Sequence, residues 1–556
     1  MPQKPVFSKA PLLDIPHSFL SNGLIRTDDA RIYSLYHNAS VYSEYPCLWE
    51  GLFCIACLLK KNPMAEPVVL KITQALKEKE EGAFKGKLTE QIHIARAAFS
   101  LYEYTVDRSI LKRIASWLRY LEIEFDRLSL EDGLLFHAAD LMELLVRYYQ
   151  VTGLKSVLRL CSLLRAASFD WTTALHTFQQ SIPIKNEAAE FSLDGYASPD
   201  QINFDEKEKI INHTELLADG IRFTLFSGIF SGNRQDLSAG HTAWRYLMKR
   251  HRALCGGTTG DPFLLGKAAD KAVSTSTLLA WAEAFASQMH LNNDAWAADE
   301  LIRIVFNGLD YCINTDNIPK KQWVNQLKKD TSDQAVNLLG RITRTVACIY
   351  RHAVTITHNG IRINYLIPCR MIHTFEKKTV ILNMTYHDIR FESNNSFNAE
   401  VELFVSSTET AEIFVLCKDK QINIMHEKPC DSQTGIYLHT EKEWFPGEGY
   451  CFKQGDAVIS EETNHQGVCF FVRNRLMSLP VNGQFFPVAV SGQAVCSGGK
   501  TAVKVGKLTH WKEENGNLRD IPVLPEIKDS ISDIQLEPYS STDRRISMFP
   551  KGKKHE

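Results

Sequence analysis

Carboxylates in unusual settings are the first candidates for chemistry in this chain. Asp140 lies inside the apolar segment 134–151 (LLFHAADLMELLVRYYQV), where a buried carboxylate is costly unless it is paired or wet, so a pocket position is one explanation. Asp261 stands in a Gly-Asp-Pro sequence, which is also a common turn, and Asp333 precedes a helical segment, where it also suits a first helical turn. Two carboxylates that face one pocket can donate a proton and attack or activate a nucleophile.

Several enzyme classes are disfavoured because their motifs do not occur. The chain contains no HExxH, GxGxxG or GxSxG sequence. The segment 260–267 (GDPFLLGK) resembles a P-loop, but five residues separate its glycines instead of four, and Ala268 replaces the magnesium-binding Ser/Thr. Cys54 and Cys57 form a CxxC without a downstream partner pair, and the 13 cysteines are otherwise scattered, a pattern typical of buried reduced thiols. We therefore expect no cofactor.

Composition and charge are those of an ordinary globular protein. The 556 residues are 44% hydrophobic, and 63 Lys+Arg against 65 Asp+Glu give a formal net charge of -2. That balance disfavours a nucleic-acid partner. No apolar run reaches the roughly 18 residues of a membrane span, and the N-terminal residues lack the apolar segment of a signal peptide. We expect a cytoplasmic protein of two to four domains with no membrane partner.

The hydrophobic pattern changes near residue 352. Before this point, apolar residues recur at helical spacing, most clearly in 48–60, 109–124, 134–151, 155–167, 208–226, 272–289, 294–309 and 333–351. After it, polar and apolar residues alternate, and 355–363 is typical of two strands around an Asn359-Gly360 turn. We predict an α/α toroid over 1–352, a β-sandwich domain over 353–511 and a C-terminal strap with a disordered tail over 512–556.

Several short segments occur in the order and spacing of a known family. They are Trp49-Glu50-Gly51, Tyr149–Gly153, the glycine-rich 256–261 (GGTTGD), 293–300 (NDAWAADE) and Phe306–Leu309. Together they resemble glycoside hydrolase family 127, the β-L-arabinofuranosidase-like enzymes, over roughly residues 40–370. The resemblance implies an α+β multidomain fold in which an (α/α)6 barrel is followed by an antiparallel β-sandwich. It also implies a carbohydrate substrate.

This chain departs from the family pattern at the positions of the zinc ligands. The resemblance implies a zinc-bound cysteine nucleophile held by a Glu-x-Cys motif and a later Cys-Cys pair. This chain has Ser274-Thr275-Ser276 at the first motif and Asp333-Gln334 at about the second. Hydroxyl and carboxamide groups are poor zinc ligands, so we expect no metal. The resemblance places the general acid at Asp261 and the nucleophile at Asp333, and a metal-independent two-carboxylate mechanism is expected.

Further polar and aromatic residues are expected to bind the substrate in the cup of the toroid. They are Trp49, Glu50, Asp140, Asn212, His213, His241 and Trp281. Aromatic rings can pack against a sugar face, and histidines can orient hydroxyl groups. Other charges in helical segments, such as Glu300 and Arg303, are expected to lie on solvated helix faces.

Two other functions remain open from the sequence. Loss of every zinc ligand is also expected of a catalytically inactive carbohydrate-binding protein with the same fold. A polysaccharide lyase is a further alternative, since such enzymes abstract a proton beside a uronate, and His213, Arg245 and Tyr246 offer residues of the right type. A homodimer that pairs through the sandwich is possible by analogy. The sequence does not give the sugar or the stereochemical course.

Overall fold

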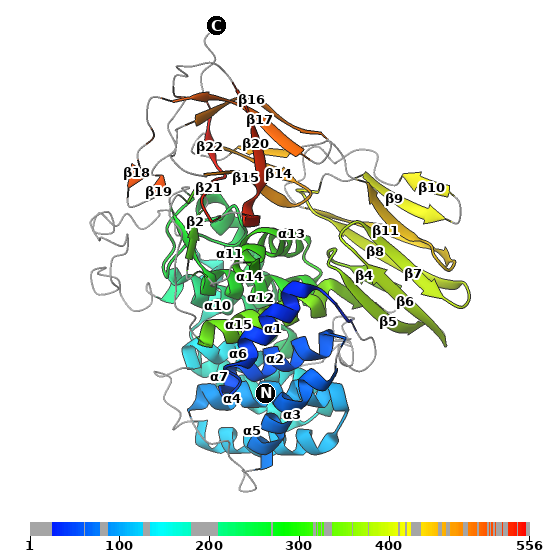
Figure 1. Ribbon diagram of the computed structural model, residues 1–556. Coiled ribbons are helices and arrows are strands. Elements are labelled where there is room, and N and C mark those ends of the chain that lie inside the picture. The colour runs from blue at the N-terminus through cyan, green and yellow to red at the C-terminus, as the bar shows by residue number, and fades with distance from the viewer. Residues whose placement is uncertain are drawn as a thin grey trace.

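Figure 1 shows the computed structural model of the chain. It describes residues 25–60, 62–77, 87–125, 134–178, 210–267, 271–314, 319, 321–323, 325–326, 336–357, 360–375, 377–409, 412–417, 420–423, 435–453, 459–462, 467–481, 488–497, 500–508, 511, 513–514, 517–518, 525, 532–541 and 543–551.

Helices dominate the chain up to residue 353 (Figure 1). All eight helical segments that the hydrophobic pattern indicates overlap with helices, and 155–167 has the predicted bounds. The helices are α1 (Ala30–Ser40), α2 (Pro46–Leu58), α3 (Glu66–Lys77), α4 (Leu88–Thr105), α5 (Arg108–Glu124), α6 (Leu134–Thr152), α7 (Lys155–Ala167), α8 (Trp171–His176), α10 (Thr214–Ser231), α11 (Arg234–Arg250), α12 (Thr275–Asn292), α13 (Ala295–Arg303), α14 (Asp310–Asn314) and α15 (Val336–Ala353).

Local sequence explains several helix ends. Gly153 directly follows α6 with a φ of +64°, a left-handed conformation that glycine adopts without strain. Asn293 follows α12 in the same region, with a φ of +57°, and Asp294 then takes the N-cap position of α13. The predicted helix over 294–309 differs in its second half, because Ile304–Leu309 is a π-helical segment that continues α13.

Six helices contact one another in a closed cycle. In order around the cycle they are α2, α4, α6, α10, α12 and α15, and α15 returns to α2. The contact that closes the cycle is very close. A Cβ built at Gly51 of α2 would lie 2.3 Å from Oγ1 of Thr343 and 2.5 Å from the backbone nitrogen of Arg344, both on α15.

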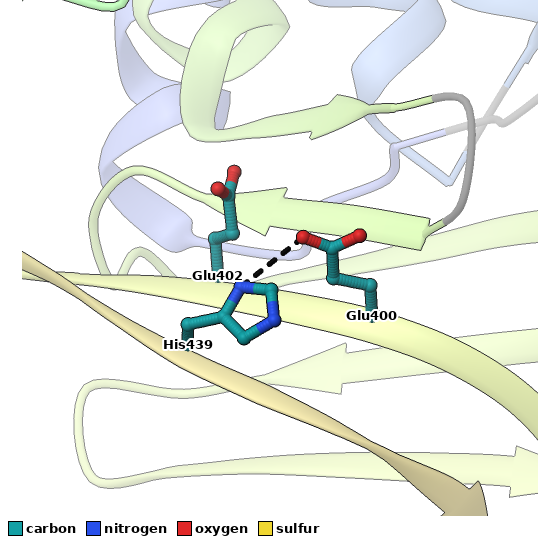
Figure 2. Close-up of side chains that lie close together, drawn as sticks. All are labelled: Glu400, Glu402 and His439. Carbon is teal, nitrogen blue, oxygen red and sulfur yellow. Dashed lines mark ion pairs between the residues drawn. The ribbon is translucent and has the colours of Figure 1, made fainter.

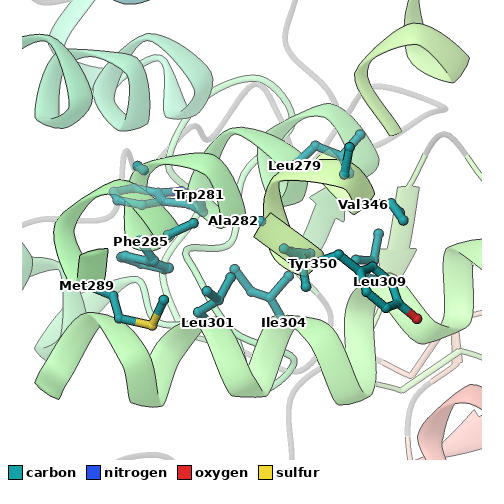
Figure 3. Close-up of a cluster of buried hydrophobic side chains, with 14 of the residues drawn as sticks. Leu279, Trp281, Ala282, Phe285, Met289, Leu301, Ile304, Leu309, Val346 and Tyr350 are labelled. Carbon is teal, nitrogen blue, oxygen red and sulfur yellow. The ribbon is translucent and has the colours of Figure 1, made fainter. Parts of the chain in front are cut away.

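A large aromatic and aliphatic cluster packs α12 against its neighbours. Figure 3 shows Trp281, Phe285 and Met289 of α12 beside Leu301 of α13 and Tyr350 of α15. The rings of Trp281 and Phe285 stack with their centroids 5.2 Å apart. Burial of such side chains is the main source of stability for the helical part.

Two sheets follow the last helix and pack through aromatic rings. The four-stranded sheet has the order β11 (Ile436–Trp444), β8 (Phe397–Val405), β4 (Gly360–Ile363), β3 (Val354–Ile356). The six-stranded sheet has the order β10 (Lys420–Asn423), β9 (Glu412–Cys417), β12 (Gly449–Lys453), β7 (Asp388–Ser393), β6 (Lys378–Met384), β5 (Cys369–Phe375). Phe391 of β7 meets Phe397 of β8 and Trp444 of β11 at centroid distances of 5.6 and 4.8 Å.

One strand pair departs from the antiparallel arrangement that the resemblance implies. The predicted hairpin is confirmed, since β3 and β4 pair antiparallel. However, β4 pairs with β8 in parallel. Between these two strands the chain runs through β5, β6 and β7 of the six-stranded sheet, and it returns to the four-stranded sheet in the same direction as β4.

A third sheet lies at one end of the helical part, above it in the view of Figure 1. Its path is β13 (Ile459–Glu462), β14 (Gly467–Val472), β15 (Arg475–Pro480), β20 (Ser532–Pro538), β17 (Lys500–Lys507), β16 (Val488–Ser497), with β21 (Arg545–Ile546) and β22 (Phe549–Pro550) alongside. Strand β20 belongs to the segment that the sequence assigns to a strap, but it lies between β15 and β17 inside this sheet.

Two short two-stranded pairings complete the described strands. They are β1 (Ala272–Ser274) with β2 (Lys321–Trp323), and β18 (Glu513–Glu514) with β19 (Asn517–Leu518). Among the described helices, none combines the length and the apolar character that a bilayer crossing requires.

Candidate active site

A polar cavity of about 650 Å³ opens where the six cyclically packed helices begin. Each helix contributes side chains from its first turns. The lining includes Cys47 from α2, Glu90 and His93 from α4, His137 and Asp140 from α6, Glu215 and Asp219 from α10, Ser276 from α12, and Arg341 and Arg344 from α15. Asp261, from the glycine-rich loop, and Ser274, the N-cap of α12, complete this group.

The cavity has an unusually acidic lining that is partly neutralised from within. Five carboxylates reach it: Glu90, Asp140, Glu215, Asp219 and Asp261. Against them stand the two guanidinium groups of Arg341 and Arg344. Nη1 of Arg341 donates to Oε2 of Glu215 at 2.8 Å, and Nη1 of Arg344 donates to Oδ2 of Asp140 at 3.1 Å. Helix N-termini add positive potential, which favours carboxylates at these positions.

Beneath the cavity, buried ion pairs join all six helices. Arg222 of α10 donates to Asp140 of α6 and, at 2.6 Å, to Glu283 of α12. Arg344 of α15 donates to the same Glu283 at 2.8 and 2.9 Å. Arg96 of α4 donates to Glu50 of α2 at 2.8 Å. Charges buried in this way are stable only when each is paired and hydrogen-bonded.

Asp140 shows how strongly this network acts on one carboxyl group. Only 3% of the residue is exposed. Burial alone would raise the pKa of Asp140, but the guanidinium groups of Arg344, Arg222 and Arg96 outweigh it and hold the pKa well below its usual range. The same balance lowers the pKa of Glu283 to about 2. Both groups are therefore ionised at neutral pH and unsuited to donate a proton.

Asp219 is different from these neighbours. Its Oδ1 atom lies 3.8 Å from Nη2 of Arg222, and its Oδ2 atom lies 3.6 Å from Nη2 of Arg341, both beyond hydrogen-bonding distance. Burial raises the pKa of Asp219, and the two guanidinium groups offset that effect only in part. It lines the cavity one helical turn below Glu215.

Two histidines form one wall of the cavity. The rings of His93 and His137 meet edge to face with centroids 5.2 Å apart, and Nδ1 of His137 lies 3.3 Å from Oδ2 of Asp140. Burial, with the nearby His137 and Arg344, lowers the pKa of His93 to about 3. His93 is therefore neutral at physiological pH. It can accept a hydrogen bond from a hydroxyl group through one ring nitrogen and donate one through the other.

The structure brings two of the sequence-predicted residues to this cavity. They are Asp140 and Asp261. The Asp261 side chain is 26% exposed, and its Oδ2 atom lies 3.7 Å from Nζ of Lys321. Asp333 and Gln334 lie outside the described residues.

The other predicted residues do not line the cavity. Trp49 is buried and its Nε1 donates to the carbonyl of Ser43 at 2.8 Å. Trp281 is fully buried in the core, where its Nε1 donates to Oγ1 of Thr258 at 2.9 Å, so no indole surface is free for a sugar (Figure 3).

Glu50 and the three remaining predicted residues serve the scaffold. Glu50 is buried below the cavity as the partner of Arg96. Asn212 is buried and its carbonyl accepts from the backbone of Leu264 at 3.1 Å. His213 caps α10 through its side chain. His241 is exposed on α11 and stacks on Trp296 with centroids 5.6 Å apart.

Zinc does not fit the residues that stand at the first motif. Oγ of Ser274 accepts from the backbone nitrogen of Thr277 at 3.1 Å and so caps α12. Oγ of Ser276 donates to Glu215. Both hydroxyl groups are thus used in hydrogen bonds, and neutral hydroxyls bind zinc far more weakly than thiolate or imidazole.

Among the described residues, one group of His, Cys, Asp and Glu side chains is close enough to hold an ion, and it lies elsewhere. It consists of Glu400 and Glu402 of β8 and His439 of β11 (Figure 2). Nδ1 of His439 lies 3.1 Å from Oε1 of Glu400, and Nε of Arg362 donates to Oε2 of Glu402 at 2.5 Å. The two carboxylates and the histidine lie close together because they form ion pairs between neighbouring strands, Glu400 with His439 and Glu402 with Arg362.

Sequence reasoning missed most of the cavity. The residues not foreseen include Glu215, Asp219, Arg341 and Arg344. The signal that singled out Asp140, a charge inside an apolar helix, was available for them too. Glu215, Asp219 and Arg222 occupy positions i, i+4 and i+7 of a helix whose other residues are mostly apolar.

No protein-family model matches the sequence, and no curated protein matches it. A solved glycoside hydrolase matches with a TM-score of 0.70 at 12% identity, over 98% of this chain and 100% of that one. A GH127 β-L-arabinofuranosidase from Geobacillus stearothermophilus T6 gives 0.66 at 13% identity, over 93% and 91%.

A third solved structure, a GH127 β-arabinofuranosidase, matches with a TM-score of 0.61 at 12% identity, over 94% of this chain and 92% of that one. Identities this low establish the fold and leave the activity open. The similarity extends over nearly the whole of each chain. The chain therefore has the GH127 glycoside hydrolase fold, which confirms the resemblance seen in its sequence.

Proposed function

We propose that the protein is a glycoside hydrolase that cleaves a small glycoside or oligosaccharide in the cavity by metal-independent carboxylate catalysis. The observation that carries the proposal is the acidic cavity itself, which lies at the N-terminal ends of six helices in a GH127-like fold. Glycoside hydrolysis requires one acid to protonate the leaving oxygen and one carboxylate to attack or activate water. Asp261 takes the acid role and Asp333 the nucleophile or base role in this proposal.

The proposal also includes the arrangement of the helices around the cavity. We infer that the six cyclically packed helices are the inner ring of an (α/α)6 barrel that extends to about residue 352. The domain after it is a β-sandwich. The last helix, α15, ends at Ala353, and strand β3 begins at Val354. In this arrangement the inner helices begin around the substrate, so first-turn side chains are the ones that meet it.

The sugar is best sought first among arabinofuranosides. Two of the matching structures are arabinofuranosidases. The test is a panel of 4-nitrophenyl glycosides that includes the β-L-arabinofuranoside, with release of nitrophenol as the readout. Asp261→Asn should lower kcat by roughly 100- to 10,000-fold if Asp261 transfers a proton. Asp388→Asn, on β7 of the six-stranded sheet, is the matched control and should leave kcat unchanged.

A catalytically inactive sugar-binding protein is the second candidate. What favours it is the replacement of the expected glutamate and cysteine ligands of the first motif by Ser274 and Ser276, whose hydroxyl groups are engaged in hydrogen bonds. Binding without turnover would show as a rise in Tm with free sugars and no release of nitrophenol from any glycoside. The lyase alternative has no such support, since Arg245 and Tyr246 are exposed on α11 and line no part of the cavity.

A further inference from the structure

The ion-pair network that joins the six helices contains more carboxyl groups than guanidinium groups, and His137, 3.3 Å from Asp140, adds a positive charge only when it is protonated. Six guanidinium groups take part, from Arg96, Arg147, Arg222, Arg341, Arg344 and Arg351. Seven carboxyl groups face them, from Glu50, Glu103, Asp140, Glu143, Glu215, Asp219 and Glu283. A buried carboxylate without its own cation is very costly, so a network of this composition is relieved when one carboxyl group takes up a proton.

The geometry shows which of the seven is the odd one. Six of them accept hydrogen bonds from arginines, at 2.6 Å in the case of Glu103 and 2.8 Å in the case of Glu50. Asp219 accepts none from the described residues, and its Oδ1 atom is fully buried without a partner. The residue is only 7% exposed, and that small exposure is to the cavity.

The groups that face Asp219 come from three other helices besides its own. Arg341 of α15 lies 3.6 Å away, and Arg222 of its own helix 3.8 Å away. Asp140 of α6 and Glu283 of α12 oppose them with negative charge. Both arginines are already bound closely to other carboxylates, to Glu215 in one case and to Asp140 and Glu283 in the other. Little positive charge is therefore left for Asp219.

We propose that Asp219 is a protonated, neutral carboxylic acid that donates its hydrogen bond to an oxygen of the sugar bound in the cavity. This role rests on the proposed function for the identity of the ligand, but the protonation does not. A neutral acid is both a donor and an acceptor, while every ionised carboxylate around it accepts only. Asp219 can therefore donate a hydrogen bond to a hydroxyl, ring or glycosidic oxygen of the sugar. The ionised Asp140 and Glu283 have no proton to donate.

The protonation is tested without any sugar. Infrared difference spectra at pH 7 between the wild type and Asp219→Asn should show the carbonyl stretch of a protonated carboxylic acid that the variant lacks. Unfolding free energies give a second readout with a definite sign. If Asp219 is protonated, the wild type loses stability relative to Asp219→Asn as pH rises from 4 to 7, because only the unfolded state releases the proton. A missing infrared band, or a relative gain in stability, overturns the proposal.

The donor role is tested by calorimetry with L-arabinose and a set of other neutral monosaccharides. Asp219→Asn keeps an N–H donor and should bind within about threefold of the wild type, whereas Asp219→Leu should bind roughly tenfold more weakly, as expected for one lost hydrogen bond. Equal binding by the leucine variant, or equal loss in both variants, overturns the donor role. If the wild type binds none of the sugars, the donor role falls together with the proposed ligand, while the infrared result still decides the protonation.

Discussion

Arg344 and Asp140 lie 204 positions apart in the sequence, yet Nη1 of the arginine lies 3.1 Å from Oδ2 of the aspartate. The pair connects α15 to α6 at the floor of the cavity, and both side chains are nearly buried, with 11% and 4% exposed. Arg344 also binds Glu283 of α12, so one side chain fixes three helices. The floor of the cavity is therefore charged rather than apolar, and three helices meet in its ion pairs.

Removal of one charge from this floor should destabilise the whole helical part. Asp140→Asn removes one of the two carboxylates that Arg222 and Arg344 share, and breaking a buried ion pair in this way costs about 3–5 kcal/mol of unfolding free energy. Asp28→Asn is the matched control, because its partner Lys60 is exposed and such a pair contributes at most about 1 kcal/mol. Urea unfolding of the three proteins measures the difference. Equal stability of the two variants would contradict the structural role given to Asp140.

Stability should fall steadily as the pH is lowered below about 6.5. Burial lowers the pKa of His93 to about 3 and that of His290 to about 4, so the unfolded state binds their protons first and is favoured between pH 6.5 and those values. Glu143 and Glu283, with pKa values lowered to about 2 by arginines against the effect of burial, add to the loss below about pH 4.5. The raised pKa of Asp219 has the opposite effect, because a proton bound to it in the folded state favours folding as the pH falls. This single group is outweighed by the several groups just named.

Thermal unfolding at pH 7.0, 5.5 and 4.0 measures this dependence. The expected result is a decreasing Tm along the series, with a shallower decrease for His93→Gln because one of the protonation steps is removed. A Tm that is highest at pH 4.0, or a variant with the same slope as the wild type, would show that the buried histidine does not contribute as described.

The close contact between α2 and α15 should not tolerate a side chain at Gly51. An added methyl group would meet Oγ1 of Thr343 at 2.3 Å and the backbone nitrogen of Arg344 at 2.5 Å, so the helices must move apart. We expect Gly51→Ala to lower the unfolding free energy by about 1–3 kcal/mol. Ser116→Ala on the exposed face of α5 is the control and should change it by no more than about 0.5 kcal/mol. A Gly51→Ala protein as stable as this control would argue against the close packing.

The helices and strands were largely predictable from periodicity, because each element needs only its own residues to bury one face. The bounds of α7 and the β3–β4 hairpin illustrate this. What periodicity could not give is the partner of a polar residue. Glu300 and Arg303 were expected on a solvated face, but both are buried, since Arg252 pairs with Glu300 and the ring of Phe471 from the third sheet covers Arg303.

The site was harder to predict for the same physical reason. Asp140 was found because a carboxylate inside an apolar helix requires an explanation, and Asp261 because of the family resemblance. Trp281 and Glu50 were misplaced because the sequence does not tell which face of a helix meets the cavity: Trp281 faces Trp244 and Phe285 in the core, and Glu50 is buried against Arg96. Asp219 was missed because its role depends on charged neighbours from three other helices, Arg341, Asp140 and Glu283, which are distant from it in the sequence.

The central claim is that carboxylates of this cavity cleave a glycosidic bond without a metal. The most direct measurement is hydrolysis of the 4-nitrophenyl glycoside panel by the wild type and by Asp261→Asn, before and after treatment with a chelator, together with the zinc content of the protein. We expect hydrolysis by the wild type that survives chelation and falls at least about 100-fold in Asp261→Asn. Stoichiometric zinc with activity that is lost on chelation and restored by zinc, or full activity in Asp261→Asn, would contradict it.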